Sequence, residues 1–281
     1  MVADVDIPGS PNPNKALWEK GDFTRIAETM RGSGAALVDQ LGIGPGMQVL
    51  DLGCGDGTTA VPAARRGADV RGVDISANLV AAGNERARQE GLANLRFDEG
   101  DASQLVGLAE ESFDLVLTMF GAMFAPRPYD VAKEMVRVTR PGGRIVMGNW
   151  IPGDPTLVAQ ILRIAGAYSP PPPPGFVSPM TWGVEDEVAN RFSAAGVDTV
   201  AFGRQEYRFE LEAPPADFLR LFRDYYGPTM NAYAAAEAAG NAEDLHRELE
   251  DLFASQNDGD PTRTSIGATY LLVTATKEHR R

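Results

Sequence analysis

The sequence of 281 residues has one cysteine, Cys54, and two histidines, His246 and His279. A single cysteine excludes an intrachain disulfide, and so few Cys and His residues cannot assemble a zinc site with the usual ligand spacing. No uninterrupted apolar run approaches the roughly 18 residues of a transmembrane helix, and the N-terminus has neither the basic start nor the apolar stretch of a signal peptide. We therefore expect a soluble, cytoplasmic protein with no membrane partner and no metal.

Basic residues are also scarce, since 26 Lys and Arg stand against 39 Asp and Glu and give a formal net charge of -13. The field of such a chain repels polyphosphate backbones, so nucleic acid is not expected as a partner. An acidic balance is also ordinary among cytosolic enzymes. Hydrophobic residues make up 43% of the chain, enough for the core of one large or two small domains. Composition alone does not settle the oligomeric state.

Short apolar runs alternate with amphipathic stretches of helical length in the first half of the chain. This alternation is typical of βαβ units and a parallel sheet. The strands are predicted at residues 48–51, 69–74, 95–97, 114–118 and 144–149, with helices at 58–66, 77–90 and 129–139. Pro141-Gly142-Gly143 predicts a turn directly before the fifth strand.

The flanking regions have a different pattern. Two or three short helices are predicted between residues 15 and 41, and a loose arm precedes them. After the fifth strand come helices at 156–168, 185–195, 216–226 and 229–255 and strands at 199–211 and 269–276. We divide the chain into an arm with cap helices (1–46), a ligand-binding core (47–150), an insertion (151–196), and C-terminal strands and lid helices that complete the same domain (197–281).

Five consecutive prolines, Pro170 to Pro174, lie within the insertion. Such a run holds polyproline II geometry and forms a stiff spacer. A rigid connector is the favoured interpretation, and a docking site for another protein is the alternative.

The stretch from Val49 to Gly57 is the most informative motif. An apolar strand contains Asp51 and leads into a loop with glycine at positions 53, 55 and 57. Glycine allows a sharp turn and the close approach of a ligand. No Gly-Lys-Ser/Thr follows, which excludes a P-loop for phosphates. Cys54 is interpreted as a small residue that fits the turn.

Acidic residues at the ends of the next two strands narrow the choice of ligand. Asp74 ends the second strand 23 residues after Asp51, where its carboxylate can accept two hydrogen bonds from a ribose diol. Asp51, close to the glycine loop, would repel a pyrophosphate and attract an amino group. Asp101, after the third strand, is placed to receive the amino group of an adenine.

With these motifs the chain resembles the class I S-adenosylmethionine-dependent methyltransferases. The resemblance covers residues 48–149 and rests on five motifs in the order that this family uses: 49–57, Asp74-Ile75, Gly100-Asp101-Ala102, Phe113 to Val116, and Arg140 to Arg144. It implies an α/β fold of the Rossmann-like, doubly wound kind, with a mainly parallel seven-stranded sheet, helices on both faces, and an antiparallel last strand. Later segments look like a bacterial subgroup of small-molecule methyltransferases.

The resemblance also implies roles for single residues in binding S-adenosylmethionine. Gly53 and Gly55 would lie beneath the methionine part, and Asp51 would face its amino group. Asp74 would hold the ribose hydroxyls, and Ile75 would pack on the adenine. The remaining cofactor residues would be Asp101 and Ala102 at the adenine edge and Phe120 beside the adenosine or the sulfonium.

The methyl acceptor is expected to be a small organic molecule in a cavity beside the cofactor. Its expected walls are Trp18, Phe23, Met123, Phe124, Trp150 and aromatic residues between Phe218 and Tyr226, Tyr225 among them. Where a base is needed, the available candidates are Asp22, Asp154, Tyr225, Tyr226 and His246, and no catalytic residue is singled out. Two alternatives stay open: a protein that binds the cofactor without turnover, and an NAD-dependent oxidoreductase.

Overall fold

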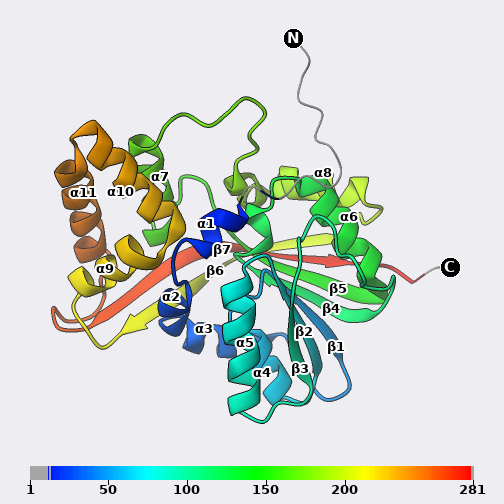
Figure 1. Cartoon of the computed structure of the whole chain (residues 1–281). Helices are drawn as coiled ribbons and strands as arrows, with labels where there is room; N and C mark the ends of the chain where they lie inside the picture. Colours follow the sequence, from blue (N-terminus) through cyan, green and yellow to red (C-terminus); the bar gives the residue numbers. More distant parts are fainter. Residues whose placement is uncertain (1–11, 13, 280–281) are drawn as a thin grey trace.

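The structure, a computed structural model, describes residues 12 and 14–279 (Figure 1). Its strands are β1 Gln48–Leu52, β2 Asp69–Asp74, β3 Leu95–Glu99, β4 Phe113–Met119, β5 Thr139–Trp150, β6 Val200–Leu211 and β7 Thr264–Thr276. They form one seven-stranded sheet in the order β3-β2-β1-β4-β5-β7-β6. Strands β1 to β5 pair in parallel, and β7 is antiparallel to both β5 and β6. The predicted fold class and the antiparallel last strand are confirmed.

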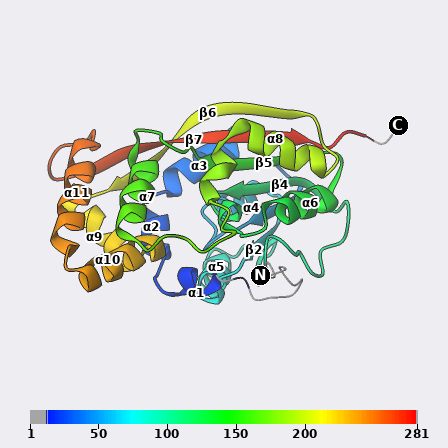
Figure 2. The ribbon, with the colours of Figure 1, turned by 90° about the horizontal axis from the view of Figure 1, so that it is seen from above.

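Helices cover both faces of the sheet. They are α1 Lys15–Glu19, α2 Thr24–Glu28, α3 Arg31–Gln40, α4 Ala60–Arg65, α5 Ala77–Gln89, α6 Pro128–Val138, α7 Leu157–Tyr168, α8 Glu185–Ala194, α9 Pro215–Tyr225, α10 Gly227–Ala239 and α11 Ala242–Ser255, with 3-10 turns η1 Ala122–Phe124 and η2 Pro179–Gly183. One apolar core joins α3, α4 and α5 to the sheet, and the other lies under α6, α7 and α8. In Figure 2, α6 and α8 lie over the near face, and α3 lies behind the sheet.

The alternation of buried and exposed side chains explains why these segments form these elements. All but the first residue of β1 are buried, as in a strand covered on both faces. In α6 the buried residues Val131, Met135 and Val138 recur every three or four positions, and Pro128 occupies the first turn, where its missing N–H costs no hydrogen bond.

Three predictions of local structure are wrong. A single helix at 229–255 is instead two, because Gly240 ends α10 with φ +76°. Strand β7 begins at Thr264 rather than at 269, since its first half pairs with β6 alone. The turn at 141–143 lies within β5, where the register shifts between Phe113 and Leu115 of the paired strand.

The long hairpin of β6 and β7 reaches beyond the rest of the sheet. Helices α9, α10 and α11 connect its two strands and pack beside α7, at the left of Figure 1. This arrangement brings α9 near α2, so the N-terminal and C-terminal additions meet above the carboxyl ends of the central strands. In the described part of the chain, no helix has both the length and the apolar character needed to cross a membrane.

Candidate functional site

A large cavity lies at the carboxyl ends of β1, β2, β4 and β5, beneath the N-terminal helices. Its volume, with the open solvent at its mouth included, is about 1190 Å³. The residues of one end come from the glycine loop and the acidic strand ends, and those of the other are mostly aromatic. In open α/β sheets, ligands bind outside the carboxyl ends of the strands, so this cavity is the candidate site.

The glycine loop after β1 has a backbone that only glycine adopts without strain. Gly53, Gly55 and Gly57 have φ of +66°, +55° and +90°. A Cβ on Gly53 would lie 2.6 Å from the Cα of Gly121, so the loop and the chain after β4 touch through two glycines. A Cβ on Gly55 would meet no atom within 4 Å, which leaves room for a ligand there.

An arginine of α3 holds this loop from outside. Arg31 forms an ion pair with Asp56 through both guanidinium ends, and its Nη1 also donates to Thr58 Oγ1 at 2.5 Å. The Asp56 side chain is 4% exposed, so this carboxylate is buried and paired rather than free for a ligand. Nothing in the sequence pattern indicated this support.

Asp51 lies buried at the base of the loop and lines the cavity. Its carboxylate accepts a hydrogen bond of 2.5 Å from Thr59 Oγ1. Burial raises the pKa of Asp51 to about 7, and the neighbouring charge of Asp74 adds to this shift. A carboxyl group in this state gains from a cationic ligand, which would favour its ionised form.

Asp74, at the end of β2, also lines the cavity. Its Oδ2 accepts a hydrogen bond from the Gly55 N–H at 2.8 Å, and its Oδ1 accepts one from the Ser76 N–H at 2.9 Å. Burial raises its pKa, while these backbone hydrogen bonds lower it. Each carboxylate oxygen has a second lone pair, so Asp74 ties the glycine loop to β2 and keeps capacity to accept from a ligand.

The segment after β3 contributes Gly100 and Ala102 to the cavity wall, and Ile75 lies nearby in the same wall. The Asp101 carboxylate accepts hydrogen bonds from the Ser103 N–H at 2.8 Å and from the Ser103 hydroxyl at 2.7 Å. Asp101 does not line the cavity, and its role toward an adenine stays a prediction.

At the other end of the cavity, aromatic rings pack on the carboxyl ends of β4 and β5. Phe120 stacks on Trp150 with a centroid distance of 3.7 Å and an interplanar angle of 6°. Tyr207 of β6 meets the Phe120 ring edge-on at 5.1 Å. Phe120 has φ +61°, a conformation that costs a residue with a side chain about 1–3 kcal/mol and occurs at functional sites.

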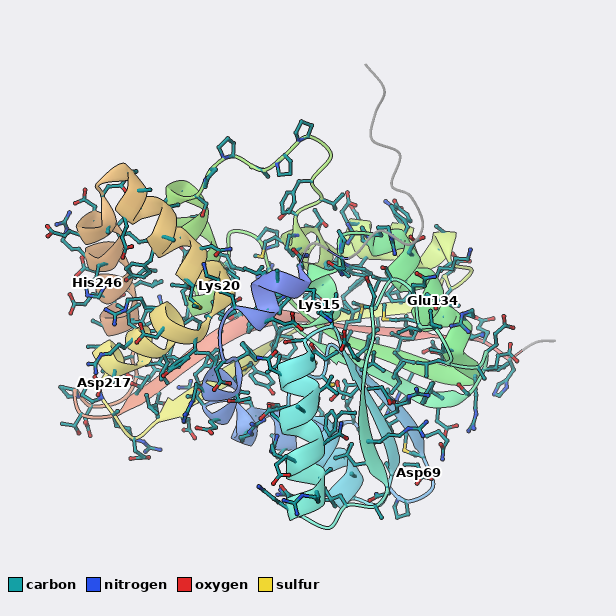
Figure 3. The ribbon with its side chains drawn as sticks, viewed as in Figure 1. Lys15, Lys20, Asp69, Glu134, Asp217 and His246 are labelled. Atoms are coloured by element: carbon teal, nitrogen blue, oxygen red, sulfur yellow. The ribbon has the colours of Figure 1, made fainter. Side chains whose placement is uncertain are left out.

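A second aromatic group covers the cavity from the helices. Trp18 of α1 contacts the rings of Phe23, Phe124 and Tyr226 at centroid distances of 6.0, 4.9 and 5.9 Å. Helix α1 is held in place by an ion pair of Lys15 with Glu99 at the end of β3. Figure 3 shows Lys15 at the upper edge of the sheet, on the opposite side from Asp69 at the start of β2.

The structure brings together most of the predicted wall residues. The predicted residues that line the cavity are Trp18, Phe23, Phe120, Phe124 and Trp150. Tyr225 and Met123 do not line it. Within the predicted range from Phe218 to Tyr226, the cavity is lined by Phe222 of α9 and by Tyr226, four residues later and directly after the helix, so the choice of Tyr225 is corrected.

Tyr207 and Phe209 of β6 were missed as wall residues. Both line the cavity and are 2% exposed. Aromatic and charged residues alternate here, since Arg208 and Glu210 follow Tyr207 and Phe209 in turn. This alternation could have placed the two aromatic residues on one face of a strand. The pattern does not tell which cavity that face lines.

Of the candidate bases, only Tyr226 lines the cavity. Asp22 and Asp154 accept local hydrogen bonds from Thr24 and Thr156. His246 is hydrogen-bonded to Tyr233 at 2.8 Å on the helices at the far left of Figure 3. Burial raises the pKa of Tyr226, so its phenol stays protonated at neutral pH and is a poor base.

The charge of the cavity wall fits the implied cofactor. Among the described residues, the wall contains three carboxylates, Asp51, Asp56 and Asp74, and no Lys, Arg or His. Such a wall attracts a ligand with a positive charge, and aromatic faces do the same. S-adenosylmethionine carries a sulfonium and an amino group, and Gly55 leaves space against the backbone for it.

Comparisons with known proteins agree with this geometry. Residues 50–147 match the family model described as a methyltransferase domain. The chain is 34% identical over 269 residues to an uncharacterized protein of Mycobacterium tuberculosis, with 94% of each chain covered. It is 36% identical over 141 residues to the methyltransferase GfsG of Streptomyces halstedii, covering 49% of this chain and 50% of the relative.

A solved structure supports the fold. The phosphoethanolamine N-methyltransferase 2 of Haemonchus contortus, in complex with S-adenosyl-L-methionine, aligns with a TM-score of 0.61 and 16% identity, over 96% of this chain and 60% of that chain. The order of the motifs, the sheet and these likenesses lead to one conclusion. The chain belongs to the class I S-adenosylmethionine-dependent methyltransferase family.

Proposed function

We propose that this protein transfers a methyl group from S-adenosylmethionine to a small organic acceptor and releases S-adenosylhomocysteine. The observation that carries the proposal is the division of one cavity into two ends. One end presents a glycine loop and buried carboxylates, which suit the cofactor. The other end presents aromatic rings, which suit a second molecule next to it.

The roles of the chain's own residues follow from their positions. Asp51 and Asp74 would bind the amino group and the ribose diol, and Gly53 and Gly55 would let the methionine part lie on the backbone. Phe120 and Trp150 would place an aromatic surface beside the positively charged sulfur. The lid residue Trp18 would exclude water from the transfer.

S-adenosylmethionine supplies an already activated methyl group. Aligning the acceptor and excluding water can therefore account for most of the catalysis. Of the candidate bases that the sequence offered, only Tyr226 lines the described wall, and its raised pKa makes it a poor base. We assign no catalytic residue.

The alternatives differ in what they require of the glycine loop. An NAD-dependent oxidoreductase would place a pyrophosphate beside the buried Asp51, where two negative charges would repel each other. A protein that binds the cofactor without turnover would have the same cofactor end. Only detection of methyl transfer distinguishes this second alternative from an enzyme.

The test is a parallel calorimetric titration with S-adenosylhomocysteine, S-adenosylmethionine and NADH. We expect micromolar binding of both adenosyl ligands and none of NADH. Binding of NADH alone would overturn the proposal. A screen of small acceptors with methyl-labelled cofactor then tests turnover.

A further inference from the structure

The aromatic end of the cavity has two walls made of different parts of the chain. Phe120 and Trp150 form a flat stacked pair on the sheet, with an interplanar angle of 6°. Phe222 and Tyr226 of the α9 region pack together with a centroid distance of 5.2 Å, and Phe23 of the α2 region contacts Tyr226 at 6.1 Å. All five residues line the same cavity. Two aromatic walls suit a flat apolar molecule.

The Tyr226 hydroxyl in this end has no hydrogen-bond partner in the described part of the chain. Tyr226 is 5% exposed, and its hydroxyl makes no hydrogen bond to any residue that the structure describes. Burial alone raises its pKa, so no charged group acts on it and it remains a phenol that can donate or accept. The hydroxyl is not among the fully buried polar atoms, so it keeps accessible surface in the cavity that it lines, and a ligand oxygen can pair with it there in place of water.

The distribution of charge limits what can occupy this end. The carboxylates of the described wall all belong to the cofactor end, and that wall has no Lys, Arg or His to pair with an anion. A carboxylate or phosphate on the acceptor would therefore be buried without a counter-ion. An ammonium would suit the aromatic rings but would be repelled by the sulfonium of the cofactor in the same cavity.

We infer that the methyl acceptor is a flat, uncharged, largely apolar molecule that carries a hydroxyl or carbonyl oxygen, and that this oxygen hydrogen-bonds to Tyr226. The inference rests on the proposed function, since it assigns the second end of the cavity to the acceptor. Tyr226 is a specificity-determining residue in this arrangement.

The experiment uses four naphthalene probes with the full chain saturated at pH 7 with sinefungin, a cofactor analogue whose amine carries a positive charge in place of the sulfonium. The probes are 2-naphthol, naphthalene, 2-naphthoate and 2-naphthylmethylammonium, which share one ring system and differ in charge and in the hydroxyl. Quenching of tryptophan fluorescence measures each affinity. We expect 2-naphthol to bind at least about tenfold more tightly than the anion, which finds no counter-ion, and than the cation, which the positive charge of the bound analogue repels.

The Tyr226→Phe variant tests the hydrogen bond. It should weaken 2-naphthol binding about three- to tenfold and leave naphthalene binding unchanged. Tyr225→Phe is the matched control, because this neighbouring tyrosine lies outside the cavity wall and its change should alter neither affinity. An unchanged affinity of Tyr226→Phe for S-adenosylhomocysteine shows that the variant is folded.

Several results would overturn the inference. They are equal or tighter binding of the anion or the cation, no binding of either neutral probe, or an undiminished affinity of Tyr226→Phe for 2-naphthol. The charge series needs only the wild-type chain, so it remains decisive if the variant does not fold. Failure of the proposed function would appear separately, as absent binding of S-adenosylhomocysteine before any probe is added.

Discussion

The two ends of the cavity are built in different ways. At the cofactor end, Asp51, Gly53, Gly55 and Asp74 lie within 24 consecutive residues and are tied to one another by hydrogen bonds of their own segment. At the aromatic end, the wall residues come from many parts of the chain: α1, the residue before α2, the ends of β4 and β5, η1, β6 and the end of α9. Their rings pack against one another. One end depends on backbone geometry and charge, and the other on packing.

This difference predicts which kinds of substitution each end of the cavity tolerates. Glycines with positive φ and buried carboxylates have no equivalent replacement, because a Cβ or a lost charge leaves strain or unpaired groups. Apolar side chains in a cavity wall can exchange with others of similar volume at a cost below about 1.5 kcal/mol. We therefore expect the cofactor end to be intolerant of change and the aromatic end to adapt to different acceptors.

The largest expected effect is that of Gly53→Ala. Its new Cβ would meet the backbone of Gly121 at 2.6 Å, and neither chain can move without shifting β1 or η1. Calorimetry should show at least a tenfold loss of affinity for S-adenosylhomocysteine. The free energy of unfolding should fall by about 1–2 kcal/mol from the left-handed backbone, and further from the clash.

Gly91→Ala is the matched control for this change. Gly91 has the same φ of +66°, but a Cβ there would meet nothing within 4 Å. It should lose stability through backbone strain alone and bind S-adenosylhomocysteine like the wild type. If both variants behave alike, the close contact between Gly53 and Gly121 has no role in the site.

The comparison also explains how much could be predicted from the sequence. The residues of the cofactor end could be placed together because they follow one another along a strand, a loop and the next strand, and this spacing puts them at one edge of a parallel sheet; their roles toward the cofactor stay predictions. The local pattern gives these strands but not their order in the sheet, β3-β2-β1-β4-β5, which the structure shows. The ion pair of Arg31 with Asp56 was not predicted, since no periodicity links α3 to the loop.

The aromatic end was predicted only in part. Trp18, Phe23 and Trp150 were placed in the wall, and the range from Phe218 to Tyr226 was named without telling which of its rings face the cavity, so Tyr225 was singled out wrongly. The side of a strand or helix that faces a cavity depends on its distant neighbours. For β6 these are β7 and α3, which lie far along the chain, so Tyr207 could not be assigned from its own segment.

The second prediction concerns Asp74→Ala, which removes charge-assisted hydrogen bonds to the ribose together with the tie to Gly55. Each charge-assisted bond contributes about 1.5–3 kcal/mol, which corresponds to a roughly ten- to hundredfold loss of affinity for S-adenosylhomocysteine. Asp69→Ala, at the opposite end of β2, is the control, and its affinity should equal that of the wild type. Unchanged affinity of Asp74→Ala would contradict the assignment.

The third prediction concerns the pH dependence that Asp51 introduces. Its pKa of about 7 in the folded chain lies above the ordinary value of 3.8, so between these values the folded state binds more protons than the unfolded state. The free energy of unfolding should therefore decrease as pH rises from 4 to 7, by up to about 1.4 kcal/mol per unit from this group. Urea unfolding of Asp51→Asn should show a shallower decrease than the wild type.

Ligand binding should show the opposite trend. The amino group of S-adenosylhomocysteine favours the Asp51 carboxylate, so affinity should rise roughly tenfold between pH 6 and 8. The rise should be smaller in Asp51→Asn, where Asp74 remains as a titrating group with a raised pKa. Identical pH profiles for the two proteins would show that Asp51 does not face the ligand.

The smallest expected effect belongs to Tyr207, whose phenol lies between the two ends. Its hydroxyl has no hydrogen-bond partner in the described chain, and the charges of Asp51 and Arg31 act on it. A Cβ on Gly34, beside Thr58 of the glycine loop, would lie 3.0 Å from this hydroxyl. These neighbours place the hydroxyl near Asp51, where the proposed function puts the amino-acid part of the cofactor, although its ring belongs to the aromatic group around Phe120.

Tyr207→Phe should therefore weaken binding of S-adenosylhomocysteine about two- to tenfold, through the loss of one neutral hydrogen bond. Binding of 5′-methylthioadenosine, which lacks the amino-acid part, should not change, and calorimetry with both ligands measures the contrast. Tyr270→Phe is the control, because the Tyr270 hydroxyl donates to Gln205 at 2.8 Å and lies outside the cavity wall. An equal loss for both ligands would instead place Tyr207 at the adenosine. The cofactor would then occupy space beside the aromatic rings as well as beside Asp51 and Asp74.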